Sequence, residues 1–122
     1  MQKKILIVDD EPNILLSLDF LMRRGGYLVF IARNGSEALD ILNKEVPDLV
    51  LLDIMMPDVD GYQICTYIKS TKALSSTKVM FLSAKSKESD VKYGLDLGAD
   101  DYMTKPFSTR ALMTKVQELI PQ

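Results

Sequence analysis

Side chains that can do chemistry stand directly after four of the five β-prone segments of this chain. Three are carboxylates, one is a hydroxyl and one is an ammonium group: Asp9 and Asp10, Asp53, Ser83, and Lys105. Carboxylates can bind metal ions or attack an electrophile, and hydroxyl and ammonium groups can bind anionic oxygens. Taken singly, each is more often a solvated surface group, so the inference depends on whether the fold brings them together.

Asp53 has the most informative surroundings. The four apolar residues 49–52 before it show no alternation, which is typical of a strand buried on both faces of a parallel sheet. Pro57 and Gly61 after it indicate a loop. Ligands of open α/β sheets bind where the strands end at their carboxyl side, so Asp53 is placed for chemistry. The alternative is a solvated acid that starts a turn.

The rest of the chain alternates strand and helix patterns. We expect strands at 5–8, 27–32, 49–52, 78–82 and 101–104, each followed by a segment of helical periodicity. The helices are expected to begin at Pro12, after Asn34, near Gly61, before Val91 and after Ser108 as N-cap. Five such units predict an α/β fold in which helices cover both faces of a five-stranded parallel sheet. We expect one flavodoxin-like, doubly wound domain over residues 1–122, with strand order 2-1-3-4-5.

Three local features are predicted within the helices. Asn34 and Glu37 have the spacing of a capping box, and Cys65 has the spacing of a core residue. The fourth helix, which Gly98 closes, has a thin apolar face. We expect Val91 and Leu95 to point inward, together with Tyr93 or Leu97, and we expect this helix to be the most mobile.

Composition excludes several classes of function. The chain of 122 residues has 15 Lys and Arg against 17 Asp and Glu, so it has no net basic charge to drive direct nucleic-acid binding. With one cysteine and no histidine, it cannot form an internal disulfide, a zinc site of His and Cys, or a histidine-based triad. No apolar run approaches the roughly 20 residues of a membrane span or resembles a signal peptide, so we expect a cytoplasmic protein without membrane contact.

The predicted strand order makes the first and third strands neighbours, so Asp9, Asp10 and Asp53 should converge in one crevice. Close anions repel one another and raise each other's pKa values unless a cation intervenes. With oxygen ligands alone, Mg²⁺ is the cation that fits. A carboxylate relieved of charge in this way can attack phosphorus, and Lys105 and Ser83 can then bind the other phosphoryl oxygens.

Four motifs together resemble the receiver domain of two-component response regulators. They are V-D-D-E-P at 8–12, L-L-D-I-M-M-P-x-x-D-G at 51–61, S-A at 83–84 and G-A-D-D-Y-M-T-K-P-F at 98–107. The resemblance implies that Asp53 is phosphorylated by a phosphohistidine of a sensor histidine kinase or a histidine phosphotransfer protein. It also implies that Mg²⁺ is bound by Asp9, Asp10, Asp53 and the backbone carbonyl of Met55.

The same resemblance assigns roles at the other strand ends. Ser83 and Lys105 would contact the phosphoryl group, the Lys105–Pro106 peptide would be cis, and Tyr102 would be a switch residue that turns inward with Ser83. The face formed by the fourth helix, fifth strand and fifth helix would then control an output domain, a partner or a homodimer. In the subfamily that dimerises through this face, an acid is usual where Ala111 stands here and an arginine where Lys115 stands.

Met55 and Lys85 occupy the places that in this family tune the hydrolysis of the phosphoaspartate, and we expect their bulk to slow attacking water. On this interpretation the domain is not an enzyme beyond catalysing its own phosphorylation and dephosphorylation. One alternative is a metal-dependent hydrolase with an aspartyl-phosphate intermediate, but such enzymes usually need a second acid where Met55 stands. Another is a flavodoxin-like nucleotide binder, but the chain lacks a glycine-rich phosphate loop after its first strand.

Overall fold

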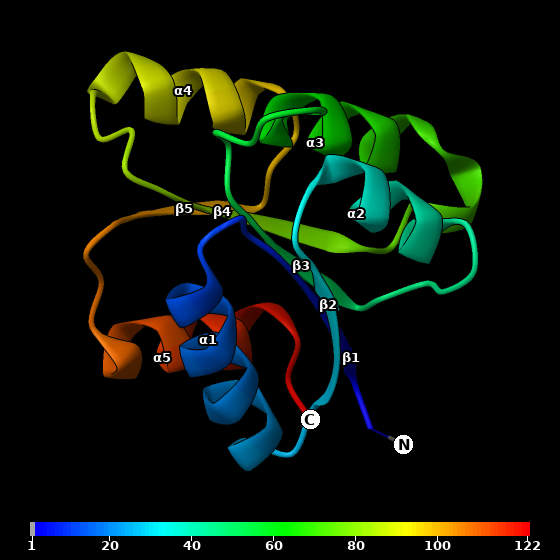
Figure 1. Ribbon diagram of the computed structural model, residues 1–122, viewed down its shortest axis with the longest axis vertical. Helices are drawn as coiled ribbons and strands as arrows, with labels where there is room; N and C mark the ends of the chain where they lie inside the picture. Colours follow the sequence, from blue (N-terminus) through cyan, green and yellow to red (C-terminus); the bar gives the residue numbers. More distant parts are fainter. Residues whose placement is uncertain (1) are drawn as a thin grey trace.

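The computed structural model describes residues 2–122 and shows a parallel sheet between two layers of helices (Figure 1). The strand order is β2-β1-β3-β4-β5 and all pairs are parallel, which confirms the predicted fold class. The elements are β1 (Lys4–Val8), α1 (Pro12–Arg24), β2 (Leu28–Ala32), α2 (Gly35–Leu42), β3 (Leu49–Leu52), α3 (Gly61–Ser70), a short 3-10 helix (Lys72–Leu74), β4 (Lys78–Ser83), α4 (Glu88–Asp96), β5 (Asp101–Thr104) and α5 (Thr109–Leu119). Within residues 2–122 no helix has the length and apolar character to cross a membrane.

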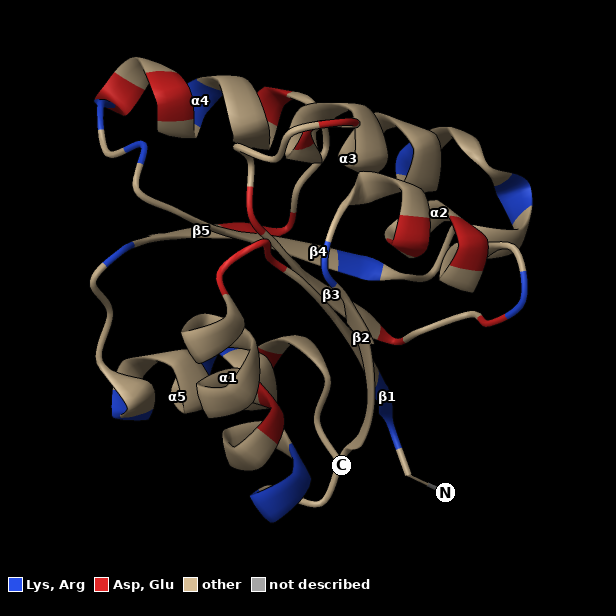
Figure 2. Cartoon of the chain, viewed as in Figure 1, with Lys and Arg blue, Asp and Glu red and all other residues tan. Residues whose placement is uncertain are grey.

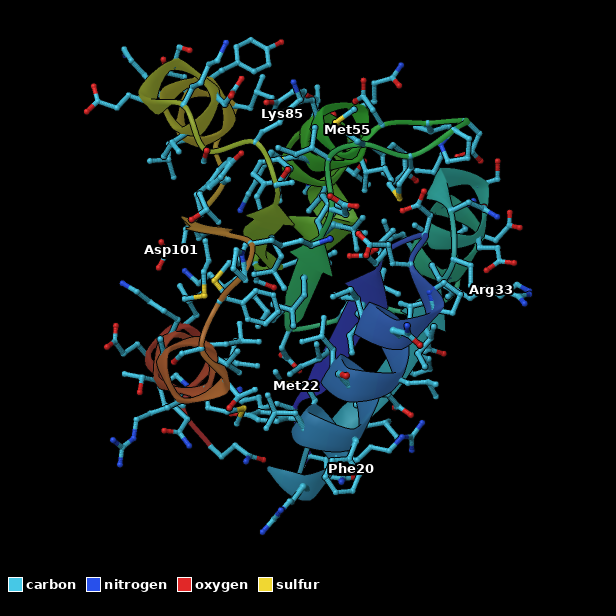
Figure 3. All side chains as sticks on the ribbon, turned by 60° about the vertical axis from the view of Figure 1, so that its left-hand side comes forward. Phe20, Met22, Arg33, Met55, Lys85 and Asp101 are labelled. Carbon is cyan, nitrogen blue, oxygen red and sulfur yellow. The ribbon has the colours of Figure 1, made fainter. Side chains whose placement is uncertain are left out.

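The sheet has a separate apolar core on each face. Helices α1 and α5 cover one face and α2, α3 and α4 lie over the other (Figure 1). Leu51 belongs to the first core, while its neighbours Val50 and Leu52 belong to the second, and all three are at most 1% exposed. On α1, Met22 is buried and Phe20 is exposed, as Figure 3 shows. The unbroken apolar run of β3 is therefore explained by burial on both sides.

The helix caps agree with the sequence in part. The Asn34 side chain accepts the backbone N–H of Glu37 at 2.9 Å, as predicted. The Glu37 carboxylate, however, accepts the backbone N–H of Arg33 at 2.8 Å, so the predicted reciprocal bond to the N-cap is wrong. A complete capping box occurs instead at the start of α3, between Asp60 and Gln63.

The predicted inward face of α4 is wrong for Leu95 and Tyr93, whereas Val91 is half-buried and Leu97, directly after the helix, packs against the second core. Leu95 is 43% exposed and Tyr93 is 53% exposed. Of the residues of α4, all of which the structure describes, Gly94 alone is buried. A Cβ atom at Gly94 would lie 3.1 Å from the Phe81 ring and 3.2 Å from the Tyr102 ring. The helix thus turns its glycine to the sheet because two aromatic rings already fill the space beneath it. The expectation for Cys65 is confirmed, since it is fully buried in the second core.

Candidate functional site

Three carboxylates meet at the carboxyl edge of the two central strands. Val8 pairs with Leu52 in the register of β1 and β3, so the residues that follow these strands emerge side by side. Asp9, Asp10 and Asp53 each place one carboxylate oxygen within 4.8 Å of the others. Asp9 and Asp53 are buried, whereas Asp10 is exposed. Figure 2 shows acidic segments gathered where the central strands end. The sequence correctly predicted that these three residues converge.

Lys105 brings a positive charge to the same edge from the end of β5. Its Nζ atom lies 2.8 Å from Asp9 Oδ2, 3.6 Å from Asp53 Oδ2 and 3.3 Å from Glu11 Oε1. Burial alone lowers the pKa of Lys105, but the hydrogen bond to Asp9 and the charge of Asp53 outweigh it and raise the pKa. The Lys105–Pro106 peptide bond is cis, as the resemblance implies. The lysine is therefore held in its charged form among several carboxylates.

One positive charge does not neutralise the site. Burial is the largest cause that raises the pKa of Asp53 to about 6, and the charge of Asp9 adds to it. The charge of Lys105 and the backbone N–H of Ile54, which Asp53 Oδ1 accepts at 2.8 Å, offset part of that rise. The donors are carboxylate oxygens and they repel one another, which is the chemistry that a hard divalent cation relieves. The residues present therefore fit Mg²⁺.

Ser83 and Tyr102 are connected through the loop that follows β4. Ser83 is buried at the end of β4, and its Oγ accepts the backbone N–H of Lys85 at 3.1 Å. The Tyr102 hydroxyl donates to the backbone carbonyl of Lys85 at 2.7 Å, and its ring lies against Phe81 with centroids 5.7 Å apart. Burial raises the pKa of the Tyr102 hydroxyl. Movement of the loop at Lys85 would therefore change the hydrogen bonds of both Ser83 and Tyr102.

Met55 lies at the rim of the site. It belongs to the loop of residues 53–60 between β3 and α3, and its side chain is 64% exposed. Figure 3 shows Met55 and Lys85 on the same side of the molecule, above the sheet edge. The Lys85 Nζ lies 4.0 Å from Asp90. Both residues thus belong to loops that follow strands of the sheet, on the side where Figure 3 places them.

Sequence reasoning assigned no role to two acids that support this edge. Glu11 donates its backbone N–H to Asp9 Oδ1 at 2.9 Å and also contacts Lys105. Its place two residues after Asp9 was a usable signal for this short-range bond. Asp58 bonds to the start of α2, 22 and 23 residues away along the chain, and no local pattern could have indicated it.

Comparison with known sequences places this arrangement in a family. Residues 5–117 match the family model of the response regulator receiver domain. The chain is similar to the alkaline phosphatase synthesis transcriptional regulatory protein PhoP of Bacillus subtilis, with 44% identity over 120 residues. That match covers 98% of this chain and 49% of PhoP, so the chain spans about half the length of this curated relative.

Solved structures agree with the sequence comparison. The BeF3-activated DrrB receiver domain is 35% identical with a TM-score of 0.91, and the match covers 100% of both chains. A putative response regulator from Chloroflexus aurantiacus is 30% identical with a TM-score of 0.92, again over 100% of both chains. A CheY-like receiver domain protein from Methanospirillum hungatei is 31% identical with a TM-score of 0.90, over 97% of this chain and 93% of that one. The chain therefore belongs to the receiver domain family of two-component response regulators.

Proposed function

We propose that Asp53 is the phosphoacceptor of this signalling domain and that its phosphodonor is a phosphohistidine of a sensor histidine kinase or a histidine phosphotransfer protein. One observation carries the proposal. Asp53 is a buried acid at the carboxyl end of a central strand, with two further carboxylates and the ammonium group of Lys105 gathered around it. Because its phosphodonor is formed with ATP, we place the domain in the cytoplasm.

The metal of the proposal is Mg²⁺. Asp9, Asp10, Asp53 and the backbone carbonyl of Met55 would hold it, since all four supply the oxygen ligands that Mg²⁺ prefers. When bound, Mg²⁺ supplies positive charge that offsets the repulsion among the carboxylates and neutralises charge on the transferring phosphoryl group. The raised pKa of Asp53, which is due first to burial and then to the charge of Asp9, supports this assignment because a bound cation would favour the ionised carboxylate.

The chain's own residues carry out the transfer. A carboxylate oxygen of Asp53 forms a bond to phosphorus while the bond from phosphorus to the imidazole nitrogen breaks, and the electron pair of that bond leaves with the imidazole. Lys105 and Ser83 bind phosphoryl oxygens, Lys105 through its ammonium group and Ser83 through its hydroxyl. The product is an acyl phosphate on Asp53, which adds close to two negative charges at the strand end.

The added charge on Asp53 would act on the neighbouring strands β4 and β5. Ser83 moves toward the phosphoryl group and the loop at Lys85 follows. The Tyr102 ring already lies inward in this structure, beneath Gly94 and against Phe81, so phosphorylation would favour this inward position through the bond from Tyr102 to the loop. The hydrogen bonds that join these three residues support this route. The face of α4, β5 and α5 would therefore report phosphorylation to its partner.

The kind of partner is also a proposal. The printed name of the Bacillus relative describes a transcriptional regulator, and this chain matches 49% of its length. We propose that the α4, β5 and α5 face controls an output domain or forms a homodimer, and that this segment does not itself bind nucleic acid. Lys115 lies 3.3 Å from Asp101 within the chain, so dimerisation through these charges would first exchange that ion pair.

The proposal is tested by incubating the protein with Mg²⁺ and acetyl phosphate or phosphoramidate and reading the intact mass before and after. The parent should gain the mass of one phosphoryl group, and Asp53→Asn should gain none. Asp40→Asn is the matched control, because Asp40 is an exposed acid on α2. An adduct on Asp53→Asn contradicts the proposal. Turnover of a phosphoester without a protein adduct favours the aspartyl-phosphate hydrolase instead.

A further inference from the structure

The loop between β3 and α3 is fastened to the start of α2 by one side chain. Asp58 Oδ1 accepts the backbone N–H of Gly35 at 3.0 Å, and Asp58 Oδ2 accepts both the backbone N–H of Ser36 at 2.9 Å and its hydroxyl at 2.7 Å. Hydrogen bonds from Ser36 hold the pKa of the Asp58 carboxyl well below its usual range, so the side chain stays charged. Charge-assisted bonds of this kind are stronger than neutral ones.

The two segments also touch through their backbones. A Cβ atom at Gly35 would collide with the backbone oxygen of Val59, so a larger residue there would push the loop away. At its base the same loop is closed by a hydrogen bond from the Gly61 N–H to the Ile54 carbonyl at 2.9 Å. Met55 therefore lies between one fixed point at Ile54 and another at Asp58.

The segment that receives Asp58 is itself joined to the acidic edge. Helix α2 begins shortly after β2, and the backbone N–H of Asp9 donates to the carbonyl of Ala32, the last residue of β2, at 3.2 Å. Asp58 thus links the loop after Asp53 to the strand end beside Asp9.

We propose that Asp58 is a positioning residue for divalent-cation binding, because it fixes the loop that presents the Met55 carbonyl. The inference rests on the proposed function above, in which that carbonyl is a ligand. A backbone carbonyl is a neutral ligand whose value depends on being held in place, since ordering a free loop upon binding costs conformational entropy. The side-chain bonds of Asp58 go to Gly35 and Ser36 and not to the three carboxylates of the site, so its loss is expected to act on this ligand first.

The test is calorimetric titration with Mg²⁺ of the parent, Asp58→Ala, Asp58→Asn and Asp40→Asn. Asp58→Ala should raise the dissociation constant for Mg²⁺ about tenfold, the lower end of what outer partners of metal ligands cost. Asp58→Asn should bind with intermediate affinity, because its amide oxygen can still accept one bond from the start of α2. Asp40→Asn removes the same charge from α2 and should bind like the parent.

Two further measurements separate positioning from other effects. Ser36→Ala removes one of the three bonds without changing the charge, and it should weaken Mg²⁺ binding in the same direction by a smaller factor. The rate of phosphorylation by acetyl phosphate should need more Mg²⁺ for half saturation in Asp58→Ala, while the rate at saturating Mg²⁺ stays that of the parent. A purely structural residue would change stability and leave the Mg²⁺ dependence unmoved.

The outcomes distinguish the two proposals. If the parent binds Mg²⁺ and Asp58→Ala binds it equally well, the positioning role is wrong and the proposed function stands. If Asp58→Ala fails to fold, Ser36→Ala and Asp58→Asn decide, and parental affinity in both overturns the inference. If the parent itself neither binds Mg²⁺ nor accepts a phosphoryl group, the proposed function fails first.

Discussion

Helices α3 and α4 lie over the same face of one sheet, yet they are attached to it very differently. Helix α3 begins with a complete capping box and buries four residues, which are Gly61, Ile64, Cys65 and Ile68. Helix α4 begins after Lys87, which provides no side-chain cap, and it buries Gly94 alone among its residues, every one of which is described. The strands repeat the contrast, because all of β3 is buried and all of β5 is half-buried.

This difference suits a domain that converts a charge into a movement. The phosphoryl group would enter at the firmly held strand end, where the acids need fixed positions to bind a cation. The loop at Lys85 and helix α4 have few buried contacts, so a modest free energy can shift them between arrangements. If α4 and β5 were buried as fully as α3 and β3, the domain could be phosphorylated without a change in conformation.

The largest predicted effect contrasts one side chain from each helix. Ile64→Ala should lower the free energy of unfolding by about 2–5 kcal/mol, because it opens a cavity in a filled core. Leu95→Ala should change it by less than about 0.5 kcal/mol, because Leu95 is 43% exposed. Urea denaturation of both variants measures the two values. Similar losses would show that α4 is held as firmly as α3.

An intermediate effect concerns the cost of ionising Asp53 at the end of the buried strand β3. In the metal-free protein the pKa of Asp53 is about 6, above its unfolded value of about 3.9, so the folded state binds more protons between these pH values. Ionisation of Asp53 therefore destabilises the folded protein. This destabilisation is absent below about pH 4 and complete above about pH 6. Asp53→Asn should stabilise the metal-free protein by about 1–3 kcal/mol at pH 7.

That gain should shrink toward zero near pH 4, where Asp53 is protonated in the parent as well. Urea denaturation with a chelator present, at pH 7 and at pH 4, measures it. Asp101→Asn provides a matched control, since Asp101 is an acid of β5 outside the cluster and paired with Lys115. An Asp53→Asn variant less stable than the parent at pH 7 would mean that Lys105 already compensates the acids.

The smallest predicted effect concerns Lys85, in the loop between β4 and α4, and the lifetime of the phosphorylated protein. Lys85→Ala should shorten the lifetime of the phosphorylated protein by a factor of about 2–5, because removal of the side chain gives water easier access to the acyl phosphate. Loss of the phosphoryl group can be followed by intact mass after the phosphodonor is removed. Lys87→Ala, two residues further along the loop, is the control. Unchanged lifetimes would show that Lys85 does not shield the site.

The sequence was most informative where short-range patterns coincide with the sheet. The apolar run 49–52 predicted β3, and the acids after 5–8 and 49–52 predicted the convergence of Asp9, Asp10 and Asp53 once the strand order was assumed. Such predictions succeed because the carboxyl ends of parallel strands necessarily share an edge. The roles assigned to Ser83, Tyr102 and Met55 rest on the family resemblance and await measurement.

Prediction failed where long-range packing overrides local pattern. The periodicity of α4 favoured Leu95 as an inward residue, but the rings of Phe81 and Tyr102 leave room for a helix backbone and not for a leucine side chain. The bonds of Asp58 were not predicted because its partners lie at the start of α2, 22 and 23 residues away along the chain. Glu37 had the right spacing for a capping box, yet it accepts bonds from both the backbone and the side chain of Arg33.

The packing of Gly94 on the rings of Phe81 and Tyr102 has a consequence for how the surface of α4 can change in evolution. Gly94 is the sole buried residue of α4, so most side chains of that helix contribute little to the core. Substitutions of the exposed residues of α4 can change which partner protein the domain binds while the free energy of folding changes little. Specificity and stability are thereby encoded by different residues of one short helix.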